Sequence, residues 1–276
     1  RATTITGLAE RTPTRTDKTV THKQVWWRAP PAAVPEAEVP PVRQAGGRRF
    51  KGKSPAMTAK AHTGSLSGHV VLLGDSIFDN KAYVSGGPDV VSQLRGELTP
   101  GWKATLLALD GDAISGVLRQ IRALPDDATH LVISAGGNDA LGFAHLLHMP
   151  AGSVAEALDL LATAQERFAA DYESMTEAVS STALPSAVCT IYDTPSSGPG
   201  YRTIRTALTV FNDCITRAAF ARGISLIDLR LICHQDSDYA NPIEPSVQGG
   251  AKISRAIAAL IDPGQRVRRS AVIGKS

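Results

Sequence analysis

The sequence predicts an α/β protein in which a parallel sheet of about five strands lies between two layers of helices, a three-layer α/β/α sandwich. Two observations carry this prediction. Between residues 66 and 263, short apolar runs alternate with longer amphipathic segments in the order strand, helix, strand throughout. The chain has 276 residues, of which 43% are apolar, and can therefore bury the core of such a domain. The alternation requires crossover connections, which build a parallel sheet covered on both faces.

Five apolar runs supply the expected strands, and four longer segments with apolar residues at helical spacing supply the expected helices. The strands are residues 69–73, 106–109, 130–135, 188–192 and 224–229. The helices are residues 114–124, 154–179, 204–221 and 249–261. The carboxyl ends of parallel strands share one edge of a sheet, so we expect the functional site at that edge.

The exit of the first expected strand carries a serine, in the heptapeptide Gly-Asp-Ser-Ile-Phe-Asp-Asn at residues 74–80. Gly74 lets the backbone turn sharply. The amides after Ser76 are expected to open the next helix, with N–H groups pointing outward where they would hold a developing anion. A serine in this place can serve as a nucleophile. The same residue types also suit an ordinary strand and turn, so this motif alone leaves both interpretations open.

Two further expected strands end in small or polar residues. The second is followed by Gly111, and the third by Gly-Gly-Asn-Asp at residues 136–139, which includes Asn138. At a shared sheet edge these groups would converge on Ser76 although they lie far apart in the sequence. A serine that attacks, a glycine N–H and an asparagine amide that hold an oxyanion form a set that acyl transfer requires.

In this order, each at the end of an expected strand, these blocks resemble the SGNH, or GDSL-type, hydrolase family, over about residues 69 to 262. The resemblance implies a flavodoxin-like sandwich and an esterase or lipase that cleaves small acyl esters without a metal or an organic cofactor. It also implies that Ser76 is the nucleophile. Its own N–H, the N–H of Gly111 and the Asn138 amide would form the oxyanion hole. The apolar residues that follow suit a short acyl chain; they are Leu141, Phe143, Leu146 and Leu147.

The fourth block departs from the family pattern. The family normally carries an Asp-x-x-His pair before its last helix, in which the histidine is the general base and the aspartate orients it. Here the corresponding residues are Asn-Pro-Ile-Glu at 241–244. The alignment places Asn241 at the aspartate position and Glu244 at the histidine position. Both members of the usual pair are therefore replaced.

Three interpretations of this departure stay open. In the first, Glu244 is itself the base, at a disadvantage because the reference pKa of glutamate, about 4.3, lies below the histidine value of about 6.5 unless burial raises it. In the second, His234, ten residues upstream, fills the role. In the third, the fold binds an acylated or carbohydrate ligand without efficient catalysis, because loss of a triad base commonly costs several orders of magnitude in rate.

Other chemistry-bearing residues offer weaker sites. His145 and His148 are three residues apart, a spacing that fits one face of a helix beside the cleft, but no third metal ligand is evident nearby. An odd number of cysteines without paired spacing indicates reduced thiols; they are Cys189, Cys214 and Cys233. Neither a Gly-x-Gly-x-x-Gly nor a Walker pattern occurs, which argues against a nucleotide site.

The charge distribution divides the chain. Residues 1–65 hold 7 of the 17 prolines and 12 basic against 4 acidic residues, so the formal net charge of +3 averages a basic segment and an acidic domain. We expect residues 1–65 to be a disordered segment of native or vector-derived origin, residues 66–263 to be the hydrolase domain, and residues 264–276 to be a basic tail. No signal-like or membrane-spanning stretch is visible. We therefore expect a soluble, cytoplasmic protein with a small-molecule ester substrate and no nucleic-acid partner.

Overall fold

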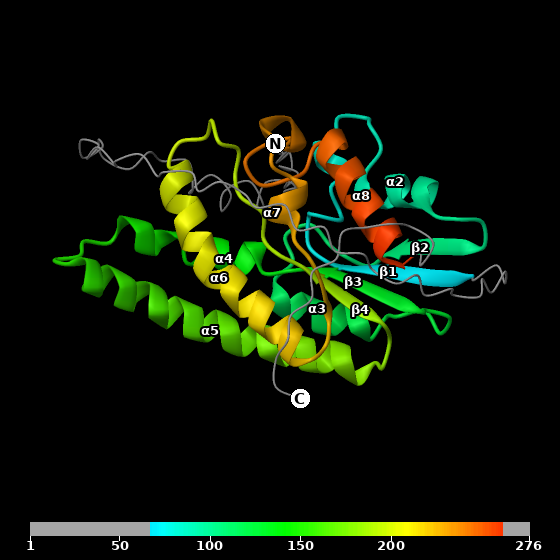
Figure 1. The fold of residues 1–276 in the computed structure, drawn as a ribbon, viewed down its shortest axis with the longest axis horizontal. Helices are drawn as coiled ribbons and strands as arrows, with labels where there is room; N and C mark the ends of the chain where they lie inside the picture. The colour runs from blue at the N-terminus through cyan, green and yellow to red at the C-terminus, as the bar shows by residue number, and fades with distance from the viewer. Residues whose placement is uncertain (1–66, 262–276) are drawn as a thin grey trace, which may run out of the picture.

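The computed structural model describes residues 67–261, so the expectations for residues 1–65 and 264–276 concern segments outside the described residues. The sheet has five parallel strands in the order β2-β1-β3-β4-β5 (Figure 1). The strands are β1 (Gly68–Gly74), β2 (Trp102–Leu106), β3 (His130–Ser134), β4 (Ser186–Cys189) and β5 (Ser225–Ile227). The predicted fold class is confirmed. Within the described range, no helix is both long and apolar enough to cross a membrane.

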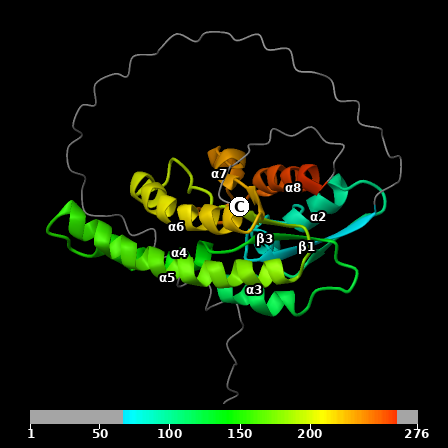
Figure 2. The ribbon, with the colours of Figure 1, turned by 60° about the horizontal axis from the view of Figure 1, so that its bottom comes forward.

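Helices cover both faces of the sheet (Figure 2). On one face lie α3 (Ile114–Ile121), α5 (Val154–Ser181) and α6 (Tyr201–Ala221). On the other lie α2 (Val90–Glu97) and α8 (Val247–Ile261). Successive residues of β1 pack on opposite sides because side chains alternate along a strand. Val71 and Leu73 join the first layer, and Val70 and Leu72 join the second. This double burial explains why β1 reads as an unbroken apolar run.

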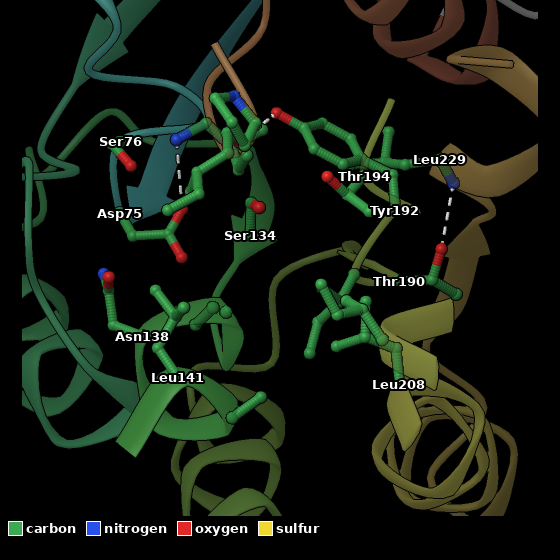
Figure 3. A pocket seen from close by; sticks show the side chains of 18 residues that line it. Asp75, Ser76, Ser134, Asn138, Leu141, Thr190, Tyr192, Thr194, Leu208 and Leu229 are labelled. Carbon is green, nitrogen blue, oxygen red and sulfur yellow. Dashed lines mark hydrogen bonds between the residues drawn. The ribbon is translucent and has the colours of Figure 1, made fainter. Parts of the chain in front are cut away.

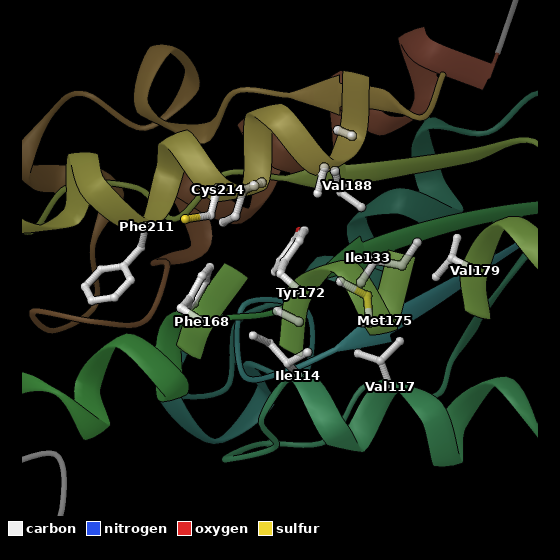
Figure 4. Packing of buried hydrophobic residues seen from close by; sticks show 14 of the residues in the cluster. Ile114, Val117, Ile133, Phe168, Tyr172, Met175, Val179, Val188, Phe211 and Cys214 are labelled. Carbon is white, nitrogen blue, oxygen red and sulfur yellow. The ribbon is translucent and has the colours of Figure 1, made fainter. Parts of the chain in front are cut away.

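Aromatic residues fill the larger of the two cores. Phe168 and Tyr172 of α5 stack with their ring centroids 5.7 Å apart, and Phe168 meets Phe211 of α6 at 5.0 Å (Figure 4). Ile114 and Val117 of α3 close this layer from the other side of α5. The expected helix at residues 154–179 is thus present, extended to Ser181. Its buried stripe holds it against the sheet, which is why its apolar residues recur at helical spacing.

The second strand was placed wrongly by the sequence. The apolar run at residues 106–109 is not the strand; β2 ends at Leu106, and the N–H groups of Leu107 and Ala108 donate to the carbonyl oxygen of Leu72. As an edge strand, β2 alternates between exposed Lys103 and buried Ala104 and shows no continuous apolar run. β4 and β5 are also shorter than expected, and residues 190–192 lie beyond the end of β4.

Among the described residues, five short helices complete the fold around the carboxyl edge of the sheet. They are η3 (Lys81–Tyr83), α4 (Gly137–Gly142), η4 (Ala144–His148), α7 (Leu229–Ile232) and η5 (Asp236–Asp238). Gly74 pairs with Ser134, so β1 and β3 end side by side. The segments that follow these two strands therefore enter the same region of the molecule.

Candidate active site

Ser76 follows a strand end that only glycine can make. Gly74 has a φ of 121°, in the left-handed region, and a Cβ there would collide with the carbonyl oxygen of Ser134. The N–H of Asp75 then donates to that same oxygen at 3.0 Å. The chain consequently turns away from β3 at once. This turn presents Ser76 at the end of the two central strands.

The expectation that a helix opens directly after Ser76 is wrong. The carbonyl oxygen of Asp75 accepts the N–H groups of Phe78 and Asp79 at 3.2 and 3.1 Å, which closes a single turn. The side chain of Asp75 accepts the N–H of Ile77 at 3.1 Å. Such local bonds from an aspartate favour a turn over a continuing helix, and α2 begins only at Val90.

Glu244 is the side chain that meets Ser76. The Ser76 hydroxyl donates to Oε1 of Glu244 at 3.4 Å, although 168 positions separate the two residues in the chain. Ser76 is 2% exposed and Glu244 is 1% exposed. A separation of 3.4 Å is long for such a bond, but hydrogen bonds between catalytic groups commonly shorten only when substrate is bound. The fourth block thus delivers a carboxylate to the predicted nucleophile.

Asn241 supports this carboxylate through the backbone. Its Oδ1 accepts the N–H groups of Ile243 and Glu244 at 2.9 and 3.1 Å. The carbonyl oxygen of Glu244 accepts the N–H of Ala240 at 2.9 Å, and Tyr239 and Pro245 form an antiparallel bridge around it. The asparagine at the aspartate position therefore shapes the loop that presents Glu244.

Asn80 and Asp238 also hold the fourth block, and sequence reasoning missed both. Asn80 is fully buried and donates from Nδ2 to the carbonyl oxygen of Pro245 at 3.1 Å. Asp238 is equally buried, binds the ammonium group of Lys252 at 2.7 Å and accepts the N–H of His234 at 3.1 Å. Asn80 stands within the Gly-Asp-Ser heptapeptide, but its partner lies 165 residues away, a contact that no local pattern indicates.

Each of the three predicted oxyanion donors has an N–H left for a ligand, but Gly111 is not among the residues that line the pocket. Within the described residues, the backbone N–H groups of Ser76 and Gly111 make no hydrogen bond. Nδ2 of Asn138 donates one hydrogen to the carbonyl oxygen of Asp112 at 2.7 Å, and its second hydrogen remains for another acceptor. That bond ties the segment after β3 to the segment after β2. Figure 3 shows Ser76 and Asn138 on the same side of the pocket.

The pocket beside Ser76 is mostly apolar. It has a volume of about 80 Å³, room for several water molecules or a short acyl chain. Its apolar lining comes from Ile77, Ala135, Ala140, Leu141, Ile191, Ile204, Leu208, Leu229, Pro242 and Ile243. Of the four apolar residues expected there, only Leu141 lines it, and the other three pack against the larger core. Leu208 and Leu229 lie across the pocket from Ser76 (Figure 3).

The three histidines singled out in the sequence lie outside the pocket. His234 is exposed and does not line the pocket. His145 and His148 are exposed on η4, a short 3₁₀ helix in place of the expected amphipathic helix. Within residues 67–261, no group of three or more histidine, cysteine, aspartate or glutamate side chains is arranged to hold a metal ion. The structure therefore brings Glu244, and none of these histidines, to Ser76.

The three cysteines are buried and free, as the sequence indicates. Cys189 lies in β4, Cys214 in α6, and Cys233 directly after α7. Burial, together with the nearby charge of Asp238, raises the pKa of the Cys233 thiol to about 12. Thiols in such surroundings stay protonated and unreactive. They have no part in the candidate site.

Comparison with solved structures shows the same fold. An extracellular lipase from Streptomyces rimosus superposes with a TM-score of 0.53 at 18% identity, over 69% of this chain and 98% of the lipase. Phospholipase A1 from Streptomyces albidoflavus NA297 gives 0.51 at 20% identity, over 70% and 98%. The acetyl xylan esterase AlAXEase gives 0.53 at 16% identity, over 70% and 100%. No match was found among curated proteins.

The family assignment rests on the sequence itself. A model of the GDSL-like lipase/acylhydrolase family matches residues 72–251, which is more than half of the chain. The matched range runs from β1 into α8 and includes all four blocks. The resemblance seen in the sequence is thereby confirmed, and the chain belongs to the GDSL-like lipase/acylhydrolase family.

Proposed function

We propose that this protein is a serine esterase that hydrolyses small acyl esters through an acyl-enzyme on Ser76, with Glu244 as the general base. The observation that carries the proposal is the 3.4 Å contact between the Ser76 hydroxyl and the buried Glu244 carboxylate, beside an apolar pocket. A nucleophile paired with a base at a pocket wall is the arrangement that covalent ester hydrolysis requires.

The first half of the proposed reaction forms the acyl-enzyme. Ser76 Oγ attacks the ester carbonyl carbon while Glu244 takes the hydroxyl proton. The negative charge that develops on the carbonyl oxygen is held by the N–H groups of Ser76 and Gly111 and by the Asn138 amide. When the tetrahedral intermediate collapses, the C–O bond to the alcohol breaks, and the alcohol leaves with the proton that Glu244 returns.

The second half releases the acid. A water molecule attacks the acyl carbon and gives a proton to Glu244, and the same three donors hold the second oxyanion. Collapse of this intermediate breaks the bond to Ser76 Oγ, which regains its proton from Glu244. A carboxylate is a weaker base than an imidazole. We therefore expect slower turnover than in a family member with histidine at this position.

The deciding experiment is hydrolysis of p-nitrophenyl acetate and butyrate by the full chain, from about pH 4 to 10. Ser76→Ala should abolish turnover. Glu244→Gln keeps the size of the side chain but removes the base, and it should lower kcat by about 100-fold or more. His234→Ala is the matched control at an exposed position outside the pocket and should leave kcat unchanged.

Three outcomes would contradict the proposal. Equal turnover in Ser76→Ala and the unchanged protein would remove Ser76 as nucleophile. Loss of turnover in His234→Ala with retention in Glu244→Gln would move the base to His234. Absence of serine-dependent turnover with every ester tested would also contradict the proposal, and would favour a domain that binds an acylated or carbohydrate ligand without cleaving it.

A further inference from the structure

One polar atom of the pocket wall is buried without a partner. Thr194 lies in the segment that follows β4 and lines the pocket. Its side chain is almost completely buried, with 8% of the residue exposed, and within the described residues its Oγ1 makes no hydrogen bond. Figure 3 shows this hydroxyl pointing into the pocket. A buried hydroxyl without a partner is unfavourable, so an unpaired one beside a ligand pocket indicates a ligand contact.

Neighbouring polar side chains of the same wall are satisfied by the protein. The Thr190 hydroxyl donates to Asp228 Oδ1 at 3.0 Å and accepts the N–H of Leu229 at 3.0 Å. The Tyr192 hydroxyl donates to the carbonyl oxygen of Ile243. Both groups therefore serve to join segments of the pocket wall, and Thr194 stands out among them because its hydroxyl is unpaired.

A second hydroxyl, that of Ser134, lines the same pocket at the end of the central strand β3. Ser134 is the last residue of β3, is 4% exposed and lines the pocket (Figure 3). The wall around it consists mainly of alanine, leucine and isoleucine side chains. Each hydroxyl can donate one hydrogen bond and accept others. The pocket wall is thus mostly apolar, and these two hydroxyls are among its few polar groups. An acyl group that consists only of hydrocarbon would offer them no hydrogen-bond partner.

We propose that this pocket selects short acyl groups that carry a hydroxyl, and that Thr194 Oγ1 hydrogen-bonds that hydroxyl. The inference rests on the proposed esterase function and specifies its substrate class as esters of short hydroxy acids. A plain acyl chain would leave the Thr194 hydroxyl unpaired in a site from which it displaces water. Sites that bind a substrate hydroxyl discriminate strongly against analogues that lack it, for this reason.

The test compares methyl butyrate with methyl 2-hydroxybutyrate and methyl 3-hydroxybutyrate, using the full chain. For at least one hydroxybutyrate, kcat/KM should exceed the butyrate value by about 10-fold or more. In Thr194→Val, which replaces the hydroxyl by a methyl group of similar size, this ratio should fall towards one. Thr194→Ser keeps the hydroxyl and should keep the ratio. Thr163→Val is the matched control, since Thr163 is exposed on α5 and bonds only within its own helix.

Three results would overturn the inference. They are a wild-type preference for butyrate over every hydroxybutyrate, a hydroxybutyrate preference that Thr194→Val leaves unchanged, and the same loss of preference in Thr163→Val. Serine-dependent hydrolysis of simple esters without hydroxyl preference would sink this inference alone, whereas hydrolysis that survives Ser76→Ala would sink the proposed function.

Calorimetric binding keeps the inference testable if turnover is too slow to measure. In the Ser76→Ala background, at least one methyl hydroxybutyrate should bind more tightly than methyl butyrate, and Thr194→Val should remove the difference. Binding of every methyl hydroxybutyrate no tighter than methyl butyrate would count against Thr194 as a specificity residue. Thermal unfolding of each variant would show that the fold is intact.

Discussion

At the scale of single residues, the candidate site depends on Asn80 as much as on the two side chains that would react. Oδ1 of Asn80 accepts the N–H of Val90 at 2.9 Å, and Nδ2 donates to the carbonyl oxygen of Pro245 at 3.1 Å. Pro245 is the neighbour of Glu244 in the chain. Asn80 therefore joins the serine turn, the start of α2 and the loop that carries the carboxylate. It is a positioning residue, because it acts on the site through that loop.

Asn80→Ala should impair both stability and turnover. The substitution leaves the N–H of Val90 and the carbonyl oxygen of Pro245 without this partner, at a cost of about 1–3 kcal/mol for each buried group. Urea denaturation would measure this loss. Because the loop can then shift away from Ser76, kcat should fall with little change in KM. Full kcat in a destabilised Asn80→Ala protein would restrict Asn80 to a structural role.

At the scale of secondary-structure elements, the pairing of β1 with β3 sets the position of Ser76. The register places Gly74 opposite Ser134 at the last ladder position, and the next N–H, that of Asp75, still reaches the Ser134 carbonyl. The backbones are closest here. Glycine at position 74 is thus a requirement of the strand pairing itself.

Gly74→Ala should destabilise the protein far more than Gly86→Ala. Both glycines have positive φ, 121° and 85°, but an added Cβ meets the Ser134 backbone at Gly74 and nothing within 4 Å at Gly86. Gly86→Ala should cost about 1–2 kcal/mol, the price of the left-handed conformation alone. Gly74→Ala adds a backbone collision and should cost several kcal/mol or prevent folding. Equal thermal midpoints for the two variants would show that β1 and β3 can move apart at Gly74 without loss of stability.

The accuracy of the sequence-based predictions follows from how each element is buried. β1 and β3 are central and buried on both faces, so their apolar runs predict them directly. β2 is an edge strand and carries no continuous apolar run. The apolar run at residues 106–109 was predicted as the strand instead, but most of it follows β2 and hydrogen-bonds to the end of β1. A short apolar run cannot by itself distinguish a strand from the segment that follows it.

The candidate site was predictable only in part. Ser76 and Glu244 were proposed from the sequence because each stands in a recognisable block. The hydrogen bond between them agrees with that alignment, and their catalytic roles stay predictions. Ile204 and Leu208 of α6 were not predicted to line the pocket. Apolar residues at helical spacing predict a buried helix face, but they do not show whether that face borders the core or a pocket. The unpaired hydroxyl of Thr194 has no signature in the sequence, since it is a property of the folded molecule.

At the scale of the whole molecule, the candidate site collects segments from across the sheet. The segments after β1, β3 and β4 bring Ser76, Asn138 and Thr194 to one pocket, and the segment before α8 brings Glu244 to Ser76. The segment after β2 is tied to Asn138 through the carbonyl oxygen of Asp112. Contacts between them therefore connect parts of the chain that are distant in sequence. Asp236 of η5 adds one such connection, because its carboxylate accepts the N–H and the hydroxyl of Ser196, both at 2.8 Å.

The bond network at Asp236 predicts a pH-dependent contribution to stability. Hydrogen bonds from Ser197 and Ser196 lower the pKa of Asp236 from an ordinary value of 3.8 to about 2. A carboxyl group with a lowered pKa stabilises the folded state fully above its unfolded pKa, and this contribution is lost as the pH falls through the folded value. The unchanged protein should therefore unfold at higher urea than Asp236→Asn at about pH 5, and this difference should shrink as the pH approaches 2. A difference that is constant with pH would show that the charge of Asp236 contributes nothing.

The buried cysteines also allow local opening of the native protein to be measured without introducing a probe. All three cysteines of the chain are enclosed, one in the sheet, one in α6 and one behind α7. A thiol reagent can reach each of them only when the surrounding segment opens. The modification rates of Cys189, Cys214 and Cys233 therefore time the opening of three separate regions, and a cysteine introduced on the surface can be labelled first without interference.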